Sequence, residues 1–250
     1  MGLIQQLEKQ GNWLFRYRGQ LPLVLFILAA PVILMQENNG QHHALWTMVA
    51  VFCSVAGAVV RAYTIGTTPR GTSGRNTKQQ VAESLNTSGI YSIVRHPLYL
   101  GNYLMWIGIV VFTRDLNFIL LVSLLYWVYY ERIMMAEEAF LRNRFGTAFE
   151  SWSDRVPAFI PALSGFRAPI TPFSPVSVLR REYSGWLATV IGFAYVGFLR
   201  LLRDSGLDAN PATVKWWGQW QWILIISIVL TLALRSLKHH TSLLKEEGRS

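Results

Sequence analysis

The sequence predicts an all-α fold, a polytopic membrane bundle of about six transmembrane helices, and three observations support this prediction. Of the 250 residues, 52% are apolar and only 15% are charged, whereas roughly 25% are charged in an ordinary globular chain. Six windows contain no charged residue and are each about 15 to 23 residues long, close to the roughly 20 residues that cross a bilayer. Lysine and arginine collect between alternate windows, as they do in the cytoplasmic loops of membrane proteins.

The six windows are the expected membrane spans. The first contains Pro22 and Pro31, and the fourth is short. No small-residue cleavage site follows the first apolar run, so this run is predicted to be a span and not a cleaved signal peptide. In chain order the windows are Gly19–Gln36, Asn38–Val60, His96–Thr113, Leu116–Tyr130, Tyr183–Leu199 and Trp216–Leu234.

The distribution of positive charge predicts the orientation of the bundle. An even number of spans puts both termini on one side, and most Lys and Arg clusters then fall on the cytoplasmic side. We therefore expect an integral protein of a bacterial inner membrane with both termini in the cytoplasm. The formal net charge of +9 is mostly this topology signal, so no nucleic-acid partner is expected. The single cysteine, Cys53, excludes an internal disulfide and a Cys-rich metal site, and no metal is predicted.

Two of the cytoplasmic segments are long. Residues 64–89 are rich in Gly, Thr, Ser and Asn and are predicted to form an ordered loop. Glu131–Phe145 has helical spacing and is predicted to continue the fourth span as an amphipathic helix that Gly146 caps. Prolines make Val156–Pro161 extended and stiffen the connector that follows. Three regions are expected: 1–63 with two spans, 64–161 with two spans and the site, and 162–250 with the connector and two spans.

The first chemical pattern is Thr87–Gly101, where polar ring-bearing residues stand at the start of the third span. Tyr91, His96 and Tyr99 could stack on a planar base and donate hydrogen bonds. Pro97 suits a first helical position and leaves backbone N–H groups free nearby. The alternative is structural: a helix start with an interfacial belt of tyrosines and one more cytoplasmic arginine.

The second pattern is Glu131-Arg132 followed by Glu137-Glu138. Glu137 could bind ribose hydroxyls or an ammonium group, and Arg132 could hold an anionic acceptor. The alternative is a solvated helix face with pairs such as Glu138–Arg142 at i,i+4. The third pattern, Phe145–Trp152 leading into Val156–Pro161, predicts a helix end and an apolar segment that packs back as a candidate lid.

In this order the three patterns resemble the integral-membrane methyltransferases related to isoprenylcysteine carboxyl methyltransferase and to the phospholipid methyltransferases. The motif is Arg-His-Pro-x-Tyr-x-Gly, a membrane hairpin, Glu-Glu-x-x-Leu-x-x-x-Phe-Gly and Val-Pro-x-x-Ile-Pro, and it covers about a third of the chain. The resemblance implies S-adenosylmethionine as methyl donor, in a cofactor pocket at the cytoplasmic face. Phe149 and Trp152 stand where the family usually has two tyrosines, and the residues beyond Pro161 lie outside the resemblance.

The resemblance also implies roles for individual residues. The nearest candidate for the family's acceptor-contacting arginine is Arg132, with Arg95 and His96 as the other catalytic candidates. Arg132, Arg75 and Arg61 are the candidates for substrate binding. The implied cofactor contacts are Glu83, Ser84, Leu85, Asn86, Tyr91, His96, Pro97, Leu98, Tyr99, Gly101, Glu137 and Glu138.

Gly11–Arg18, Gly74–Thr77 and Tyr129–Met134 resemble a bacterial branch that methylates a phosphate of lipid A. We therefore expect O-methylation of an anionic group, a phosphate or a carboxylate, on a membrane lipid that enters from the bilayer. Such an acceptor needs no general base, whereas an amine must first lose a proton. The alternatives are N-methylation of a phosphatidylethanolamine-type lipid, then carboxyl methylation of a prenylated protein, or a non-enzymatic transporter or scaffold. The sequence does not indicate an oligomeric state.

Overall fold

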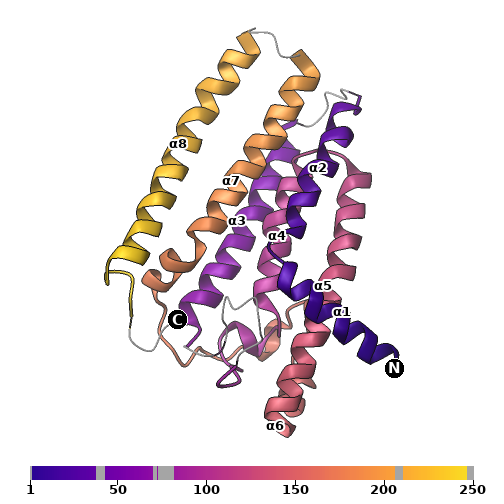
Figure 1. Cartoon of the computed structure of the whole chain (residues 1–250), viewed down its shortest axis with the longest axis vertical. Helices are drawn as coiled ribbons and strands as arrows, with labels where there is room; N and C mark the ends of the chain where they lie inside the picture. The colour runs from indigo at the N-terminus through magenta and orange to yellow at the C-terminus, as the bar shows by residue number, and fades with distance from the viewer. Residues whose placement is uncertain (1, 38–42, 70–71, 73–81, 206–210, 247–250) are drawn as a thin grey trace.

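The computed structural model describes residues 2–37, 43–69, 72, 82–205 and 211–246 (Figure 1). Within these ranges the fold contains helices and no strand, and a single isolated β-bridge joins Gly89 to Arg167. The all-α prediction is therefore confirmed for the described part of the chain. Its elements are α1 (Leu3–Tyr17), α2 (Leu21–Leu34), α3 (His43–Thr67), η1 (Ile90–Ser92), α4 (Pro97–Val111), α5 (Leu116–Phe145), α6 (Thr147–Ser153), η2 (Leu163–Gly165), α7 (Pro175–Ser205) and α8 (Pro211–His240).

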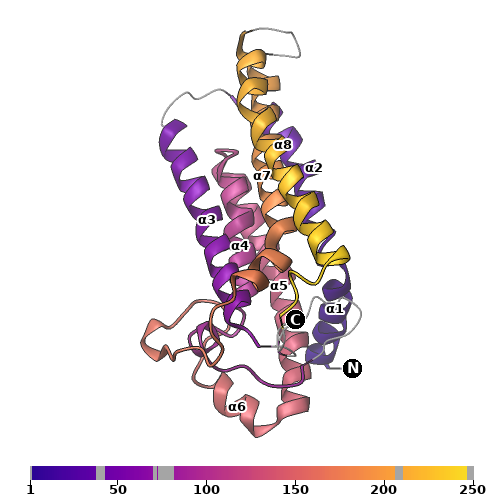
Figure 2. The ribbon, with the colours of Figure 1, turned by 90° about the vertical axis from the view of Figure 1, so that its left-hand side faces the viewer.

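Every predicted span corresponds to a helix. Helices α3, α5, α7 and α8 are long and apolar enough to cross a membrane, while α2 and α4 are shorter apolar helices. In Figures 1 and 2 these six helices lie side by side along the long axis of the molecule. The predicted continuation of the fourth span is confirmed, because α5 runs for 30 residues without a break. Gly146 ends it with φ +53°, as a C-capping glycine does.

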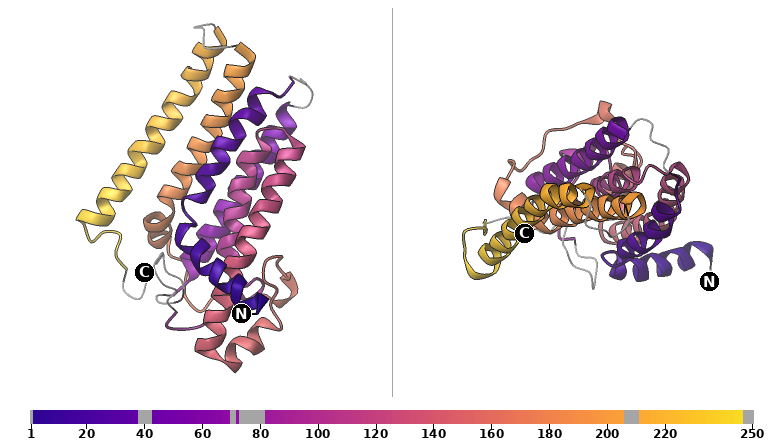
Figure 3. Two further views of the ribbon diagram at one scale, coloured as in Figure 1. Left: turned by 45° about the vertical axis from the view of Figure 1, so that its right-hand side comes forward. Right: turned by 90° about the horizontal axis from the view of Figure 1, so that it is seen from above.

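Two predicted boundaries were wrong. The connector after the third pattern was expected to last until Tyr183, but α7 already begins at Pro175, where proline's fixed φ suits the first turn. Glu182 is therefore inside a helix of the bundle. The loop predicted for residues 64–89 begins later than expected, because α3 continues to Thr67, and its residues 70–71 and 73–81 lie outside the described residues. The N-terminal segment, for which no helix was predicted, folds as the amphipathic helix α1, which lies at an angle to the bundle (Figure 3). Its exposed apolar residues, Leu3, Ile4 and Trp13 among them, suit a helix at a membrane surface.

Small residues allow the helices to approach closely. A Cβ atom at Gly57 of α3 would lie 2.6 Å from the carbonyl oxygen of Gly101 in α4. A Cβ atom at Gly11 of α1 would lie 2.0 Å from the carbonyl oxygen of Arg132 in α5. Any side chain at these positions would push the helices apart, which is why glycine is common at helix contacts in membranes.

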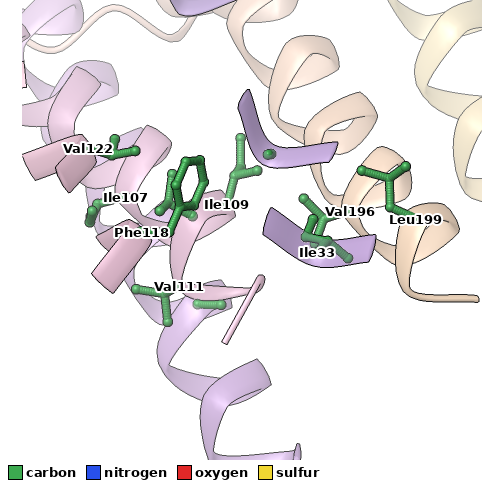
Figure 4. Close-up of a cluster of buried hydrophobic side chains, with 11 residues drawn as sticks. Ile33, Ile107, Ile109, Val111, Phe118, Val122, Val196 and Leu199 are labelled. Atoms are coloured by element: carbon green, nitrogen blue, oxygen red, sulfur yellow. The ribbon is translucent and has the colours of Figure 1, made fainter. Parts of the chain in front are cut away.

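The main apolar core joins α2, α3, α4, α5 and α7. Figure 4 shows its buried side chains pointing between these helices, with Ile33 from α2 and Val196 from α7 facing the α4–α5 hairpin. Helix α8 packs on α7, and only 6% of the apolar stretch within Thr213–His240 is buried inside the molecule. Its exposed apolar surface suits contact with lipid.

Candidate active site

Two loop segments at one end of the bundle hold the residues of the first pattern in place (Figure 2). The backbone N–H of Arg95 donates to the carbonyl of Pro157 (2.9 Å), and that of His96 donates to the carbonyl of Ala158 (3.1 Å). The N–H of Ala162 donates to the carbonyl of Ile93 (2.9 Å). The apolar segment therefore packs back on the first pattern, as predicted, and fixes His96 directly before α4. Nothing in the structure tests the further expectation that the segment moves as a lid.

His96 lies between two carboxylates of α5. Its Nε2 is 2.9 Å from Oε1 of Glu138, and its Nδ1 is 3.6 Å from Oε2 of Glu137. Nε of Arg95 is 3.0 Å from the same Oε1 of Glu138. Glu138 therefore turns toward the loop before α4 and is not part of a solvated helix face. The binding roles of Glu137 and Arg132 stay predictions. We call Arg95, His96, Glu137 and Glu138 the His96 cluster.

The carboxylates determine the protonation of His96. Burial lowers the pKa of the imidazole, but its hydrogen bonds with Glu137 and Glu138 and their negative charges outweigh burial, so the pKa is raised above its usual 6.5. A charged imidazolium has no free lone pair on either ring nitrogen and cannot accept a proton. Because both ring nitrogens face carboxylates, His96 is better placed to hold Glu137 and Glu138 than to act as a general base.

Exposure distinguishes the two carboxylates. The Glu138 side chain is 18% exposed and is bound by both Arg95 and His96. The Glu137 side chain is 33% exposed, and its nearest cation is the more distant nitrogen of His96. Glu137 therefore keeps more capacity to accept hydrogen bonds from a ligand.

A ladder of aromatic rings leads from the His96 cluster into the bundle. Tyr99 stacks on His96 with ring centroids 5.6 Å apart and an interplanar angle of 18°. Tyr130 packs against Tyr99 at 4.9 Å and stacks on Tyr126 at 4.1 Å. The hydroxyl of Tyr126 donates to the carbonyl of Tyr99 at 2.6 Å, which ties α5 to the first turn of α4.

A large cavity begins where this ladder ends. It has a volume of about 960 Å³ and lies between α1, α2, α4 and α5. Lys9, Gln10 and Arg132 lie near one end of it, and Nε of Arg132 donates to Oε1 of Gln10 at 3.0 Å. Apolar side chains such as Leu28 and Val122 line the remainder, and Tyr130 belongs to both the cavity wall and the aromatic ladder. The cavity and the His96 cluster are therefore adjacent.

The predicted cofactor residues separate into two groups. His96, Tyr99, Glu137 and Glu138 come together, directly after Arg95 and beside Pro97 and Leu98. Leu85 and Tyr91 instead pack with Phe149 and Trp152 of α6, whose Nε1 donates to the carbonyl of Tyr91 at 2.9 Å. Glu83 and Ser84 are exposed, and Oδ1 of Asn86 accepts from the backbone N–H of Ser88. Arg95 links this second group to the His96 cluster, because its Nη1 donates to the carbonyl of Ser153 in α6 at 2.8 Å.

Two predicted residues, Arg61 and Gly101, lie together away from the His96 cluster contacts. Arg61 is bound through two nitrogens to the carboxylate of Glu182, each at 2.6 Å, and through a third to Oδ1 of Asn102 at 2.5 Å. A Cβ atom at Gly101 would lie 2.5 Å from Cγ of Arg61, so this glycine makes room for the arginine. Arg75 lies outside the described residues.

Glu182 and Tyr130 were missed in the sequence. Glu182 is 0% exposed, and a carboxylate in a membrane helix is costly unless it is paired. This cost could have indicated Glu182 if the fifth span had been extended by one residue toward the N-terminus. Tyr130 carried no comparable signal, because one more tyrosine at a membrane interface is common.

The fold and the site together define a class: an integral-membrane helical protein with a histidine–carboxylate cluster at one end and a lipid-sized cavity beside it. Residues 44–148, which include the whole His96 cluster, match the family model of the phospholipid methyltransferases. This part of the chain is therefore similar to the integral-membrane methyltransferases. Members of this family use S-adenosylmethionine as methyl donor.

Three curated relatives match parts of the chain, and one of them is named as a methyltransferase. The chain is 36% identical to the cobalt-zinc-cadmium resistance protein CzcN of Cupriavidus metallidurans over 50% of this chain and 57% of the relative. It is 35% identical to the protein-S-isoprenylcysteine O-methyltransferase of Schizosaccharomyces pombe over 32% of this chain and 34% of the relative. It is 32% identical to the nickel-cobalt-cadmium resistance protein NccN of Alcaligenes xylosoxydans xylosoxydans over 39% and 46%. The chain thus spans from a third to under two thirds of these relatives, and no solved structure matches it.

Proposed function

We propose that this protein transfers a methyl group from S-adenosylmethionine to an anionic oxygen, a phosphate or a carboxylate, of a membrane lipid. The observation that carries the proposal is the shared wall between the His96 cluster and the cavity. Tyr130 contacts Tyr99, which stacks on His96, and Tyr130 also lines the cavity. A donor at the cluster and a lipid in the cavity would therefore meet at Tyr130.

The residues of the cluster fit the donor. Its ribose diol and ammonium group are hydrogen-bond donors, and Glu137 is a carboxylate that is one third exposed. Its adenine is a planar ring, and His96 and Tyr99 are nearly parallel rings. Arg95 and His96 hold Glu138, which fixes the turn of α5 that carries Glu137. We assign Glu137 to donor binding and Glu138 to positioning.

The lining of the cavity favours an anionic acceptor. Lys9 and Arg132 are its charged residues, and no carboxylate is found among the lining residues that the structure describes. When bound, S-adenosylmethionine supplies a methyl group on a positively charged sulfur. An anionic oxygen can displace that sulfur in line without a proton transfer, so the protein has to orient the reactants and exclude water. In this reaction Arg132 holds the acceptor and the apolar wall receives its acyl chains.

The alternative is N-methylation of a phosphatidylethanolamine-type lipid, in keeping with the name of the matched family. That reaction needs a group that takes a proton from the ammonium form of the lipid. Both ring nitrogens of His96 already face Glu138 and Glu137, so this residue is poorly placed to take that proton. Among anionic acceptors, the weaker resemblance of Gly11–Arg18 favours a lipid A phosphate. We place the cluster and both termini on the cytoplasmic side of a bacterial inner membrane, as the charge distribution favours.

The test is methyl transfer from radiolabelled S-adenosylmethionine by the purified full-length protein in vesicles. Vesicles that contain lipid A or phosphatidic acid should acquire label, and vesicles of phosphatidylethanolamine should acquire little. R132Q should raise KM for the lipid and leave donor affinity unchanged, because Arg132 lines the cavity. R144Q, an exposed arginine near the end of α5, is the matched control. Label on the amine of phosphatidylethanolamine alone would contradict the proposal and favour the alternative.

A further inference from the structure

The end of the bundle opposite the His96 cluster carries a second group of charged side chains. Helix α4 starts beside His96 and ends at Val111, so the loop that joins it to α5 lies at the far end. Helices α2 and α7 end there as well, at the top of Figure 1. Three partly buried arginines lie at these positions: Arg114 in the loop, and Arg200 and Arg203 in the last turns of α7.

The side chain of Gln36, just after α2, links two of these arginines. Its Nε2 donates to the backbone carbonyl of Arg114 at 3.1 Å, and its Oε1 accepts from Nη1 of Arg203 at 3.1 Å. The guanidinium carbon of Arg200 lies 5.1 Å from the ring centroid of Phe112, two residues before Arg114. The three arginines therefore come together although they belong to different parts of the chain.

Among the residues that the structure describes at this end, negative charge only partly balances the arginines. Asp204 pairs with Arg203 at 2.8 Å. The carboxylate of Asp115 is used to cap α5, where it accepts from the N–H of Phe118 at 2.7 Å, and Glu37 is exposed. Burial lowers the pKa of the Arg114 guanidinium and the charge of Arg203 lowers it further, against an opposing effect of Asp204. The arginines thus repel one another across a partly buried space.

Arg114 also carries two local signs of a functional position. Its Nε is buried and has no hydrogen-bond partner within the described part of the chain, which is costly for a charged group. Its backbone has φ +65°, which is uncommon for a residue with a long side chain. Arginines often interact with the carbonyl ends of helices, but this would not leave the Nε without an acceptor.

From this arrangement we infer that Arg114, Arg200 and Arg203 form a binding site for a phosphate-class anion, at the opposite end of the bundle from the methyl-transfer site. Such an anion would supply acceptor oxygens to Nε of Arg114 and reduce the repulsion among the three arginines. The ends of membrane spans lie at the level of lipid head groups. The phosphate can therefore belong to a lipid or be free in solution, and the chemistry of recognition is the same. The inference does not depend on the proposed methyltransferase activity.

The test uses the full-length protein in a neutral detergent and follows its thermal unfolding. One arm adds inorganic phosphate against chloride at equal ionic strength. The other adds phosphatidylglycerol or phosphatidylcholine to the micelles. The variants are R200Q and R114N, because asparagine tolerates the left-handed backbone of position 114. R235Q is the matched control, since Arg235 is exposed near the other end of α8.

The ligand should stabilise the wild type and R235Q at the same concentration. R200Q and R114N should need about tenfold more ligand for the same stabilisation, as expected for the loss of one charge-assisted hydrogen bond. Stabilisation by phosphatidylglycerol alone would identify a lipid head group, and stabilisation by inorganic phosphate would identify a free anion. Equal responses of the wild type and both folded variants to every ligand would overturn the inference. The three arginines would then only interact with the carbonyl ends of the helices. If R114N does not fold, the comparison of R200Q with the wild type alone tests the inference.

Discussion

The His96 cluster and the Arg61–Glu182 pair both place carboxylates against cations, but they differ in what remains open. Glu137 of the cluster is 33% exposed, and its distance to His96 is 3.6 Å. Glu182 is 0% exposed, and both of its oxygens are bound by Arg61 at 2.6 Å. The first arrangement has hydrogen-bonding capacity left for a ligand, whereas the second is complete within the protein.

This difference in exposure assigns separate roles to two cation–carboxylate contacts, the pair of His96 with Glu137 and the pair of Arg61 with Glu182. Arg61 joins α3 to α7 and, through Asn102, to α4. Helix α7 lies beyond the region that matches the family model, so a residue from outside that region completes the bundle around the site. Breaking the closed pair should therefore affect stability most, and breaking the open cluster should affect binding most.

The largest expected effect comes from E182Q. Removing this charge leaves Arg61 buried without a counter-ion, which typically costs about 3–5 kcal/mol of unfolding free energy. Reversible unfolding in mixed micelles would measure it. The double variant R61M/E182M removes both charges and should recover most of the loss. Equal loss in the single and double variants would show that the pair itself does not provide the stability.

E137Q should mainly lower donor affinity. The substitution keeps the shape of the side chain but removes the charge, and a hydrogen bond to a charged group is worth about 1.5–3 kcal/mol, or tenfold or more in affinity. Calorimetry with S-adenosylmethionine would measure the loss, and the unfolding temperature should change little. E150Q, at an exposed position of α6, is the control. Unchanged affinity in E137Q would remove Glu137 from the donor site.

G101V tests whether the closed pair depends on close packing of α3 and α4. The new side chain would overlap Arg61, whose Cγ lies 2.5 Å from the position of a Cβ atom. Overpacking of this kind costs about 1–3 kcal/mol. If Gly101 served the donor instead, G101V would reduce donor affinity at a wild-type unfolding temperature. Unfolding and calorimetry on the same sample separate the two results.

The smallest expected effect is a pH dependence of the open cluster. The pKa of His96 is raised in the folded state by Glu137 and Glu138, with Arg95 and Tyr99 also facing the imidazole. The resulting stabilisation is complete below the unfolded pKa of about 6.5 and is lost as pH rises through the higher folded pKa. The wild type should thus lose stability relative to H96N between about pH 6 and pH 9. A constant difference across this range would show that the pairing contributes no linked stability.

Much of this molecule follows from local sequence. Long apolar runs predict helices that cross a bilayer, and the unbroken helical spacing through Glu131–Phe145 predicts that α5 extends past the membrane. The sequence also singled out Arg95, His96, Glu137 and Glu138, whose side chains the structure brings together, while their role at a donor site stays a prediction. The start of α7 at Pro175 was not predicted, because a proline both ends a connector and begins a helix.

The sequence by itself determined the helical class, the approximate spans and the chemistry of the His96 cluster, because each depends on residue types within one segment. Only the tertiary structure decided that Arg61 pairs with Glu182, 121 residues away, and that Tyr130 separates the cluster from the cavity. It also decided that three dispersed arginines meet at the far end. The physical reason is that contacts between helices depend on the rotation and depth of each helix relative to its neighbours. Those quantities are set by packing across the whole bundle.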